Sequence, residues 1–295
     1  MLTRRGFVGS ALIAYSTLAM RDGAYAARQG IDDLTGRFTA IEKETGGRLG
    51  VAGIDTATGR RFGHRQAESF AMCSTFKVLA VSALLVRVEH GKENLHRRVH
   101  FAAGDVIEGS PISKDHFGDG MTLAEVCAAA LDYSDNTAAN MILSALGGPH
   151  AVTAFARSLG DPVTRLDRTE PTLNEATPHD PRDTTTPAAM LGNLQKLLLG
   201  NALTPASRER LTRWMIANKT GDARLRAGWP HDWRIGDKTG TGEHGTANDI
   251  AIAWPPGREP IVMAVYLTES TASPDRQNAA IAEVARAIAA TIAPP

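Results

Sequence analysis

Ser74-Thr75-Phe76-Lys77 stands where a polar approach, Glu68-Ser69, meets a long apolar run, and this junction is central to the predicted fold. The run from Phe76 to Val88 is apolar almost all round and closes at Gly91, a residue type common just past helix ends. We therefore predict a buried helix in the middle of a domain. Its first turn would place the serine and the lysine on one face, close enough for hydroxyl and amine to touch.

The pairing of Ser74 with Lys77 suggests nucleophilic chemistry. A serine hydroxyl is a weak nucleophile until a base removes its proton, and a desolvated lysine with a lowered pKa can be that base or relay the proton to one. The N–H groups of a helix start can also stabilise a developing oxyanion. However, Ser-x-x-Lys is common by chance, and Ser74 could equally cap a helix beside a solvated Lys77. The motif needs support from elsewhere in the chain.

Composition narrows the class of protein. The chain has 295 residues and a formal net charge of zero, so we expect one large or two medium domains and no binding of nucleic acid. We predict that Cys73 and Cys127, the two cysteines, are free and mostly buried. The histidines lack zinc-protease spacing, so we expect no metal and no cofactor.

Residues 1–26 are predicted to be a cleaved signal peptide. A basic start precedes a short apolar stretch, and Ala24-Tyr25-Ala26 is a small-residue cleavage pattern. The stretch is too short to span a bilayer comfortably, so we expect no membrane anchor. Thr3-Arg4-Arg5-Gly6-Phe7 resembles a twin-arginine signal, with an ordinary secretory signal as the alternative. Twin-arginine or general secretion machinery would then export a monomer, periplasmic or secreted, that begins near Ala27.

The rest of the chain places strand patterns at both ends and helical patterns between them. Strands are predicted by apolar and β-branched runs, and helices by apolar spacing of three and four. The predicted strands are Arg48–Ile54, Arg60–His64, Arg234–Lys238, Asn248–Trp254 and Ile261–Leu267. The predicted helices, besides Phe76–Val88, are 31–45, Leu123–Leu131, Asn136–Leu146, Ala151–Leu159, Pro187–Leu199, Ser207–Asn218 and Asp275–Ile292.

This order predicts an α/β plus all-α fold. An antiparallel sheet domain flanked by helices would be built from residues 27–65 and 222–295. An all-helical domain, residues 66–221, would be inserted between these two segments.

Ser134-Asp135-Asn136 opens one of the predicted helices and on its own is typical of an N-cap cluster. The functional alternative places the Ser134 hydroxyl beside Lys77, where it would pass a proton to a leaving nitrogen. Asn136 would then hold a substrate amide.

Lys-Thr-Gly occurs twice. In Lys219-Thr220-Gly221, the glycine is interpreted as the residue that follows a helix end. Lys238-Thr239-Gly240-Thr241-Gly242 follows a strand pattern instead. A lysine and two hydroxyls on a strand edge suit a substrate carboxylate, and the glycines allow close backbone approach. We therefore assign substrate binding to the second copy.

Glu170-Pro171-Thr172-Leu173-Asn174 lies in a long loop between residues 160 and 187. A glutamate with an asparagine four residues later could hold and deprotonate a water molecule, although a solvated loop carboxylate is the plainer alternative. Arg168 and Asp183 carry opposite charges and could pin the loop. The Glu170–Pro171 bond is a candidate cis peptide.

Together these motifs resemble those of class A serine β-lactamases, and in the same order. The resemblance extends over nearly the whole mature chain and implies a sheet domain and an all-helical domain with the site between them. The motifs are Ser74-x-x-Lys77, Ser134-Asp135-Asn136, Glu170-x-x-x-Asn174 and Lys238-Thr239-Gly240.

The resemblance implies a serine acyl-enzyme route. Ser74 would attack the lactam carbonyl, and either Lys77 or Glu170 would start acylation. Glu170 would drive deacylation through a water that Asn174 also holds. The further implied roles are proton donation to the lactam nitrogen by Ser134, amide binding by Asn136, carboxylate binding by Lys238, Thr239 and Thr241, and an oxyanion hole from the N–H groups of Ser74 and Thr241.

Several positions depart from the family pattern. Ala247 stands where many members carry an arginine, and Arg224 resembles the alternative arginine of a subset. Gly109 replaces an aromatic residue at the cleft mouth. Cys73 resembles half of a disulfide whose partner position is Gly242 here.

We expect small-molecule β-lactam substrates, namely penicillins and cephalosporins, whose hydrolysis gives antibiotic resistance. The alternatives are a penicillin-binding D-Ala-D-Ala peptidase, which lacks a base of the Glu170 type, and a penicillin sensor that is acylated without turnover and usually comes with membrane spans.

Overall fold

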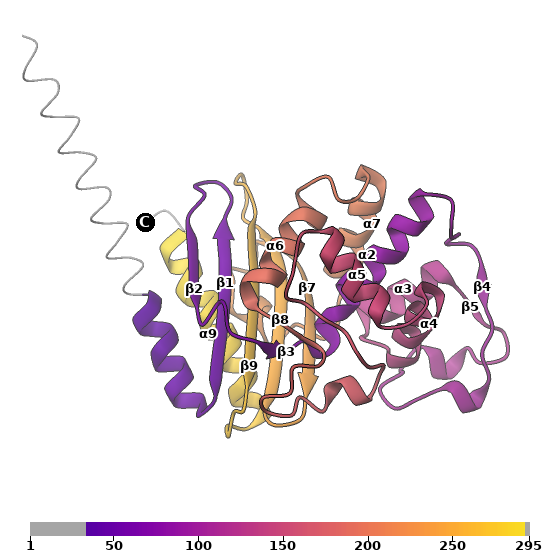
Figure 1. Ribbon diagram of the computed structural model, residues 1–295. Helices are drawn as coiled ribbons and strands as arrows, with labels where there is room; N and C mark the ends of the chain where they lie inside the picture. The colour runs from indigo at the N-terminus through magenta and orange to yellow at the C-terminus, as the bar shows by residue number, and fades with distance from the viewer. Residues whose placement is uncertain (1–33, 293–295) are drawn as a thin grey trace, which may run out of the picture.

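The computed structural model describes residues 34–292, so the predicted signal peptide lies outside the described residues. Five antiparallel strands form the main sheet, in the order β2–β1–β9–β8–β7 (Figure 1). The strands are β1 (Arg48–Asp55), β2 (Arg61–His64), β7 (Arg234–Gly242), β8 (Thr246–Trp254) and β9 (Ile261–Thr268). The central pair joins the two ends of the chain, with Val51 opposite Val265. This sheet, with its flanking helices and a helical region, confirms the predicted fold class.

Apolar clusters cover both faces of the sheet. Alternate residues of a strand point to opposite faces, so neighbouring residues pack into different clusters. On β9, Met263 and Val265 pack with apolar residues of α9 (Pro274–Ile292) and of a helix over residues 34–45. Their neighbours Val262 and Ala264 belong to the other apolar cluster, which also contains residues of α6 (Pro187–Leu198). The strand therefore reads as a continuous apolar run.

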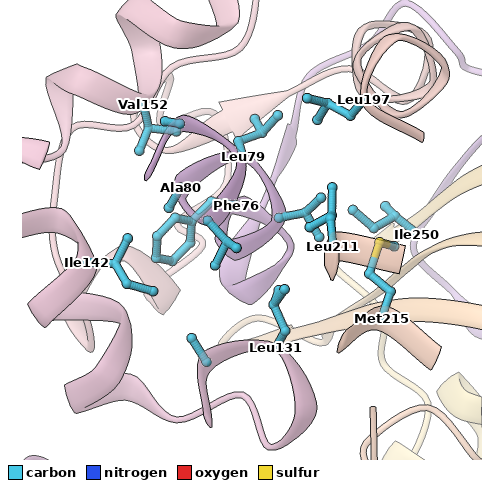
Figure 2. Close-up of a cluster of buried hydrophobic side chains, with 14 of the residues drawn as sticks. Phe76, Leu79, Ala80, Leu131, Ile142, Val152, Leu197, Leu211, Met215 and Ile250 are labelled. Carbon is cyan, nitrogen blue, oxygen red and sulfur yellow. The ribbon is translucent and has the colours of Figure 1, made fainter. Parts of the chain in front are cut away.

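The helical region is organised around α2 (Phe76–Glu89), as Figure 2 shows. This helix contacts α3, α4, α5 and α7, and both Phe76 and Leu79 are fully buried. The surrounding helices are α3 (Leu123–Asp132), α4 (Asn136–Leu146), α5 (His150–Ser158) and α7 (Pro205–Ala217). The prediction of a buried central helix is confirmed.

Short elements connect these layers. Two-residue ladders join β3 (Phe70–Ala71) to β6 (Thr184–Thr185) and β4 (Arg98–Val99) to β5 (Met121–Thr122). The remaining short helices are α8 (Leu225–Gly228) and the 3₁₀ turns Cys73–Thr75, Ala103–Asp105, Ser113–Asp115 and Thr172–Asn174.

The predicted end of one strand was wrong. We expected a strand to stop at Lys238, but β7 continues to Gly242 because every residue to that point pairs with β8. Pairing outweighs the low strand propensity of the glycines. The domain boundaries stay a prediction. Helix α6, assigned to the inserted domain, packs against β1 and β9 of the sheet.

Other expectations concern chemistry and location. Cys73 and Cys127 are free and buried, as predicted. Across residues 34–292, no group of three or more His, Cys, Asp or Glu side chains is placed to hold a metal ion. Over the same range, no helix has the length and apolar character that crossing a membrane requires.

Candidate active site

A tight turn delivers Ser74 to the start of α2. The 3₁₀ turn Cys73–Thr75 runs directly into the helix, and Cys73 takes a positive φ of 45°. Thr75 Oγ1 donates to Met72 O at 2.8 Å and contacts the buried Tyr266 hydroxyl at 3.2 Å. These contacts fix the turn against strand β9 of the sheet, so the position of Ser74 is set both by the sheet and by helix α2.

The Glu170 carboxylate contacts both the predicted nucleophile, Ser74, and Lys77. Ser74 Oγ donates to Glu170 Oε1 at 3.2 Å, and Lys77 Nζ lies 2.9 Å from the same oxygen. Asn174 Nδ2 donates to Oε2 at 2.5 Å. Glu170 is only 3% exposed, so this carboxylate does not face bulk solvent. Among the hydrogen bonds of residues 34–292 none joins Ser74 to Lys77; the expected contact is replaced by a shared acceptor.

The loop that carries Glu170 is pinned at two places. Arg168 Nε bonds Asp183 Oδ2 at 2.6 Å, as the opposite charges suggested. Asn140 on α4 accepts from Glu170 N and donates to Glu170 O, both at 2.9 Å. The Glu170–Pro171 bond is cis, as predicted. Sequence reasoning missed Asn140, because nothing in the sequence relates it to a loop thirty residues later.

The Ser-Asp-Asn cluster is both a helix cap and part of the site. Asp135 is the N-cap of α4 and accepts from Ala138 N at 2.8 Å. Its neighbours face Lys77, whose Nζ donates to Ser134 O at 2.7 Å and to Asn136 Oδ1 at 2.8 Å. The cluster therefore caps α4 and also places Ser134 and Asn136 beside Lys77.

Strand β7 supplies the opposite wall. Lys238 Nζ donates to Ser134 Oγ at 2.9 Å. Arg224 is buried and donates to Thr241 Oγ1 and to Gly240 O, each at 2.7 Å. A Cβ on Gly240 would lie 2.7 Å from Met72 O, so this glycine admits the strand against the serine turn.

All the predicted site residues gather around one cleft of about 520 Å³. Its lining residues are Ser74, Gly109, Pro111, Tyr133, Ser134, Asn136, Asn174, Thr220, Arg224, Thr239 and Thr241.

Burial sets the electrostatics of this cleft. Desolvation lowers the pKa of Lys77, and the negative charge of Glu170 partly opposes that shift. The pKa of Lys238 is held well below its usual value by desolvation and then by the positive charge of Lys77. Desolvation likewise lowers the pKa of Arg224. The cleft concentrates positive charge that is poorly solvated, and such a site favours an anionic ligand.

The first Lys-Thr-Gly copy was interpreted wrongly. Helix α7 ends at Ala217 with Asn218 as its C-cap, so Gly221 does not close it. A Cβ on Gly221 would lie 1.9 Å from Asp237 Oδ2, which explains the glycine. Thr220 lines the cleft, and its Oγ1 lies 2.5 Å from Thr239 Oγ1. Both copies of the motif therefore meet at the site.

The departures have local explanations. Gly109 has a φ of 78°, and a Cβ there would lie 2.5 Å from Asn136 Nδ2, so a side chain would strain the backbone and displace the Asn136 amide. A Cβ on Gly242 would lie 2.7 Å from Cys73 Sγ. Ala247 is buried in β8.

Comparisons with known proteins agree with this geometry. Residues 33–292 match the model of the Beta-lactamase enzyme family. β-Lactamase Toho-1 of Escherichia coli is 47% identical over 279 residues, covering 95% of this chain and 96% of Toho-1. β-Lactamase CTX-M-25 of Escherichia coli is 50% identical over 257 residues, covering 87% of this chain and 88% of its own.

Solved structures give the same result. The structure of the last common ancestor of Gram-negative bacteria class A β-lactamase is 63% identical, with a TM-score of 0.87, covering 88% of this chain and 99% of its own. The putative class A β-lactamase PenP from Rhodopseudomonas palustris is 55% identical, with a TM-score of 0.86, covering 88% and 99%.

Proposed function

Since this chain belongs to the class A β-lactamases, serine hydrolases that act on β-lactam antibiotics, we propose that Ser74 is the nucleophile and that Glu170 is the base for both halves of the reaction. The observation that carries this proposal is the shared oxygen, Glu170 Oε1, which lies within hydrogen-bond reach of Ser74 Oγ. Penicillins and cephalosporins are the proposed substrates. A peptidase or a sensor would lack a base in this place.

Acylation begins when Ser74 Oγ attacks the lactam carbonyl carbon and gives its proton to Glu170. The N–H groups of Ser74 and Thr241 stabilise the oxyanion that forms. Lys77 shares Glu170 Oε1 and so offsets the charge of this carboxylate before the attack.

Ser134 completes acylation by donating its proton to the lactam nitrogen as the C–N bond breaks. Lys77 Nζ and Lys238 Nζ lie 3.4 Å and 2.9 Å from Ser134 Oγ, and both donate to it. With both lone pairs of the hydroxyl engaged, its own proton is free to point into the cleft. The proton taken by Glu170 returns to Ser134 through Lys77, which contacts both groups.

Deacylation uses the same carboxylate. Glu170 removes a proton from a water molecule that Asn174 also holds, and the hydroxide attacks the acyl carbon. The bond from that carbon to Ser74 Oγ then breaks, and the serine regains a proton. Asn136 binds the substrate side-chain amide, while Lys238, Thr239 and Thr241, with Arg224 behind them, bind its carboxylate.

The test is turnover of a chromogenic cephalosporin and a penicillin by the protein and by Glu170→Ala. We expect sustained turnover by the protein. Because a general base contributes about 10²–10⁴-fold, both formation and hydrolysis of the acyl-enzyme, followed by mass spectrometry, should be slower in the variant. Glu175→Ala, on the same loop but with a half-exposed side chain, is the control. Rapid deacylation by Glu170→Ala would refute the assignment of the base.

We also propose that residues 1–26 direct export of a monomer by the twin-arginine route. The pair Arg4-Arg5 before a modestly apolar stretch supports that route over the general one. Replacing both arginines with lysine should retain the precursor inside the cell. Unimpaired export would instead assign the general secretion machinery.

A further inference from the structure

Thr220 belongs to the first Lys-Thr-Gly copy, to which the sequence analysis assigned no substrate contact. Its hydroxyl contacts the hydroxyl of Thr239, which is proposed to bind the substrate carboxylate. The two Oγ1 atoms are 2.5 Å apart, and both side chains line the cleft. Which of the two hydroxyls donates decides what Thr239 can offer to a substrate. The surrounding hydrogen bonds fix that direction.

Asn218 is the reference point for assigning the protons. Its Oδ1 accepts from Thr220 N at 3.0 Å, and a backbone N–H is a donor only. The amide therefore cannot be flipped, and its Nδ2 faces Asp237 Oδ2 at 2.7 Å. Asp237 is in turn bonded by Arg226 Nε at 2.5 Å. Asn218 is 2% exposed, so this orientation is held by a buried network.

The hydroxyl protons then follow by elimination. Thr220 Oγ1 lies 2.8 Å from Asn218 Oδ1 and has one proton, which it donates to that oxygen. In the contact between the threonines, Thr239 must therefore be the donor. Without a ligand, Thr239 thus turns lone pairs toward the cleft, which is the wrong polarity for an incoming carboxylate.

The network allows this polarity to reverse. If Thr220 turns its proton from Asn218 to Thr239, the Thr239 proton is released to donate to an anion. Asn218 Oδ1 stays bonded to Thr220 N, so no buried acceptor is left without a partner. The reversal exchanges one neutral hydrogen bond for a charge-assisted one, which is the stronger kind.

We propose that Thr220 is a positioning residue for the substrate carboxylate. It acts through Thr239, whose hydroxyl proton it holds as an acceptor until the anion arrives and then releases by reversing the hydrogen bond. This inference rests on the proposed function, because it takes the anion to be the carboxylate of a β-lactam. It assigns to Thr220 a task in recognising the charged end of the substrate, with no part in bond making. Thr220 is exposed at the cleft rim, so its substitution leaves the core intact.

The test compares a penicillin with its methyl ester, which lacks the charge. We expect Thr220→Val, which keeps the shape and removes the hydroxyl that holds the Thr239 proton, to lower the KM of the free acid about three- to tenfold, the value of one hydrogen bond, with a smaller change in kcat. The KM of the ester should stay within about twofold. Thr220→Ser should restore the wild-type KM.

A double substitution separates this role from direct contact. If Thr220 acts through Thr239, Thr220→Val adds nothing to the KM of Thr239→Val. A rise in the KM of the acid, an equal change in KM for acid and ester, or additive effects of the two substitutions would overturn the inference. Absence of turnover by the wild-type protein would instead refute the proposed function. The same comparison, made on dissociation constants of the acid and the ester, would then still decide the role of Thr220.

Discussion

Replacing Asp183 with alanine should both destabilise the protein and impair deacylation. The carboxylate is 1% exposed and accepts from Asp167 N at 2.7 Å, from Arg168 N at 2.9 Å and from Arg168 Nε at 2.6 Å. Removing one partner of a buried ion pair costs about 3–5 kcal/mol. For a chain of this size, each kcal/mol shifts Tm by about 2–4 °C, so we expect a drop of about 6–20 °C.

Thermal unfolding followed by circular dichroism measures the first effect, and the rate of deacylation measures the second. Deacylation should slow because the loop pinned by Asp183 carries Glu170. Asp180→Ala is the matched control, since its partner Arg182 is exposed and such pairs contribute little. A drop below about 2 °C with unchanged deacylation would refute the reasoning that this buried pair holds the base in place.

Three further outcomes are expected. Burial holds the pKa of Lys238 well below its usual value, so the protonated form destabilises the fold. Lys238→Met should therefore raise Tm, by less as the pH rises toward the usual pKa of a lysine, and should raise KM at least about tenfold. Gly109→Ala, at positive φ, should lower kcat/KM in steady-state assays, whereas Gly104→Ala, with open space around it, should not. Cys73, its pKa raised by burial to about 12, and Cys127 should react with a thiol reagent only after unfolding.

Much of the fold and site could be predicted because the information is local. The helix that begins at Phe76 is apolar on all sides, so its burial is visible within one segment of sequence. The Ser-x-x-Lys, Ser-Asp-Asn and Lys-Thr-Gly motifs are each contiguous. Their joint occurrence in order excludes chance better than any one of them does.

What could not be predicted depends on tertiary contacts. Gly221 was interpreted as a helix-ending glycine. The residue must instead be a glycine because a Cβ would collide with the carboxylate of Asp237, which is sixteen residues further along the chain. The Asn140 side chain, on helix α4, bonds both the backbone N–H and the backbone carbonyl of Glu170 in the loop. The glycine-rich end of β7 is a strand only because β8 pairs with it along its whole length. Residue type alone carries none of these relations.

The stability and the chemistry of this cleft come from the same charges. Lys77, Lys238 and Arg224 are all buried, and desolvation lowers the pKa of each, so each weakens the folded state in its charged form. Glu170 partly offsets the charge of Lys77. A carboxylate ligand brings a further negative charge to the β7 side, where Lys238 and Arg224 lie. Ligand binding should therefore relieve part of the destabilisation, and an anionic β-lactam should raise Tm in Glu170→Ala more than its neutral ester does.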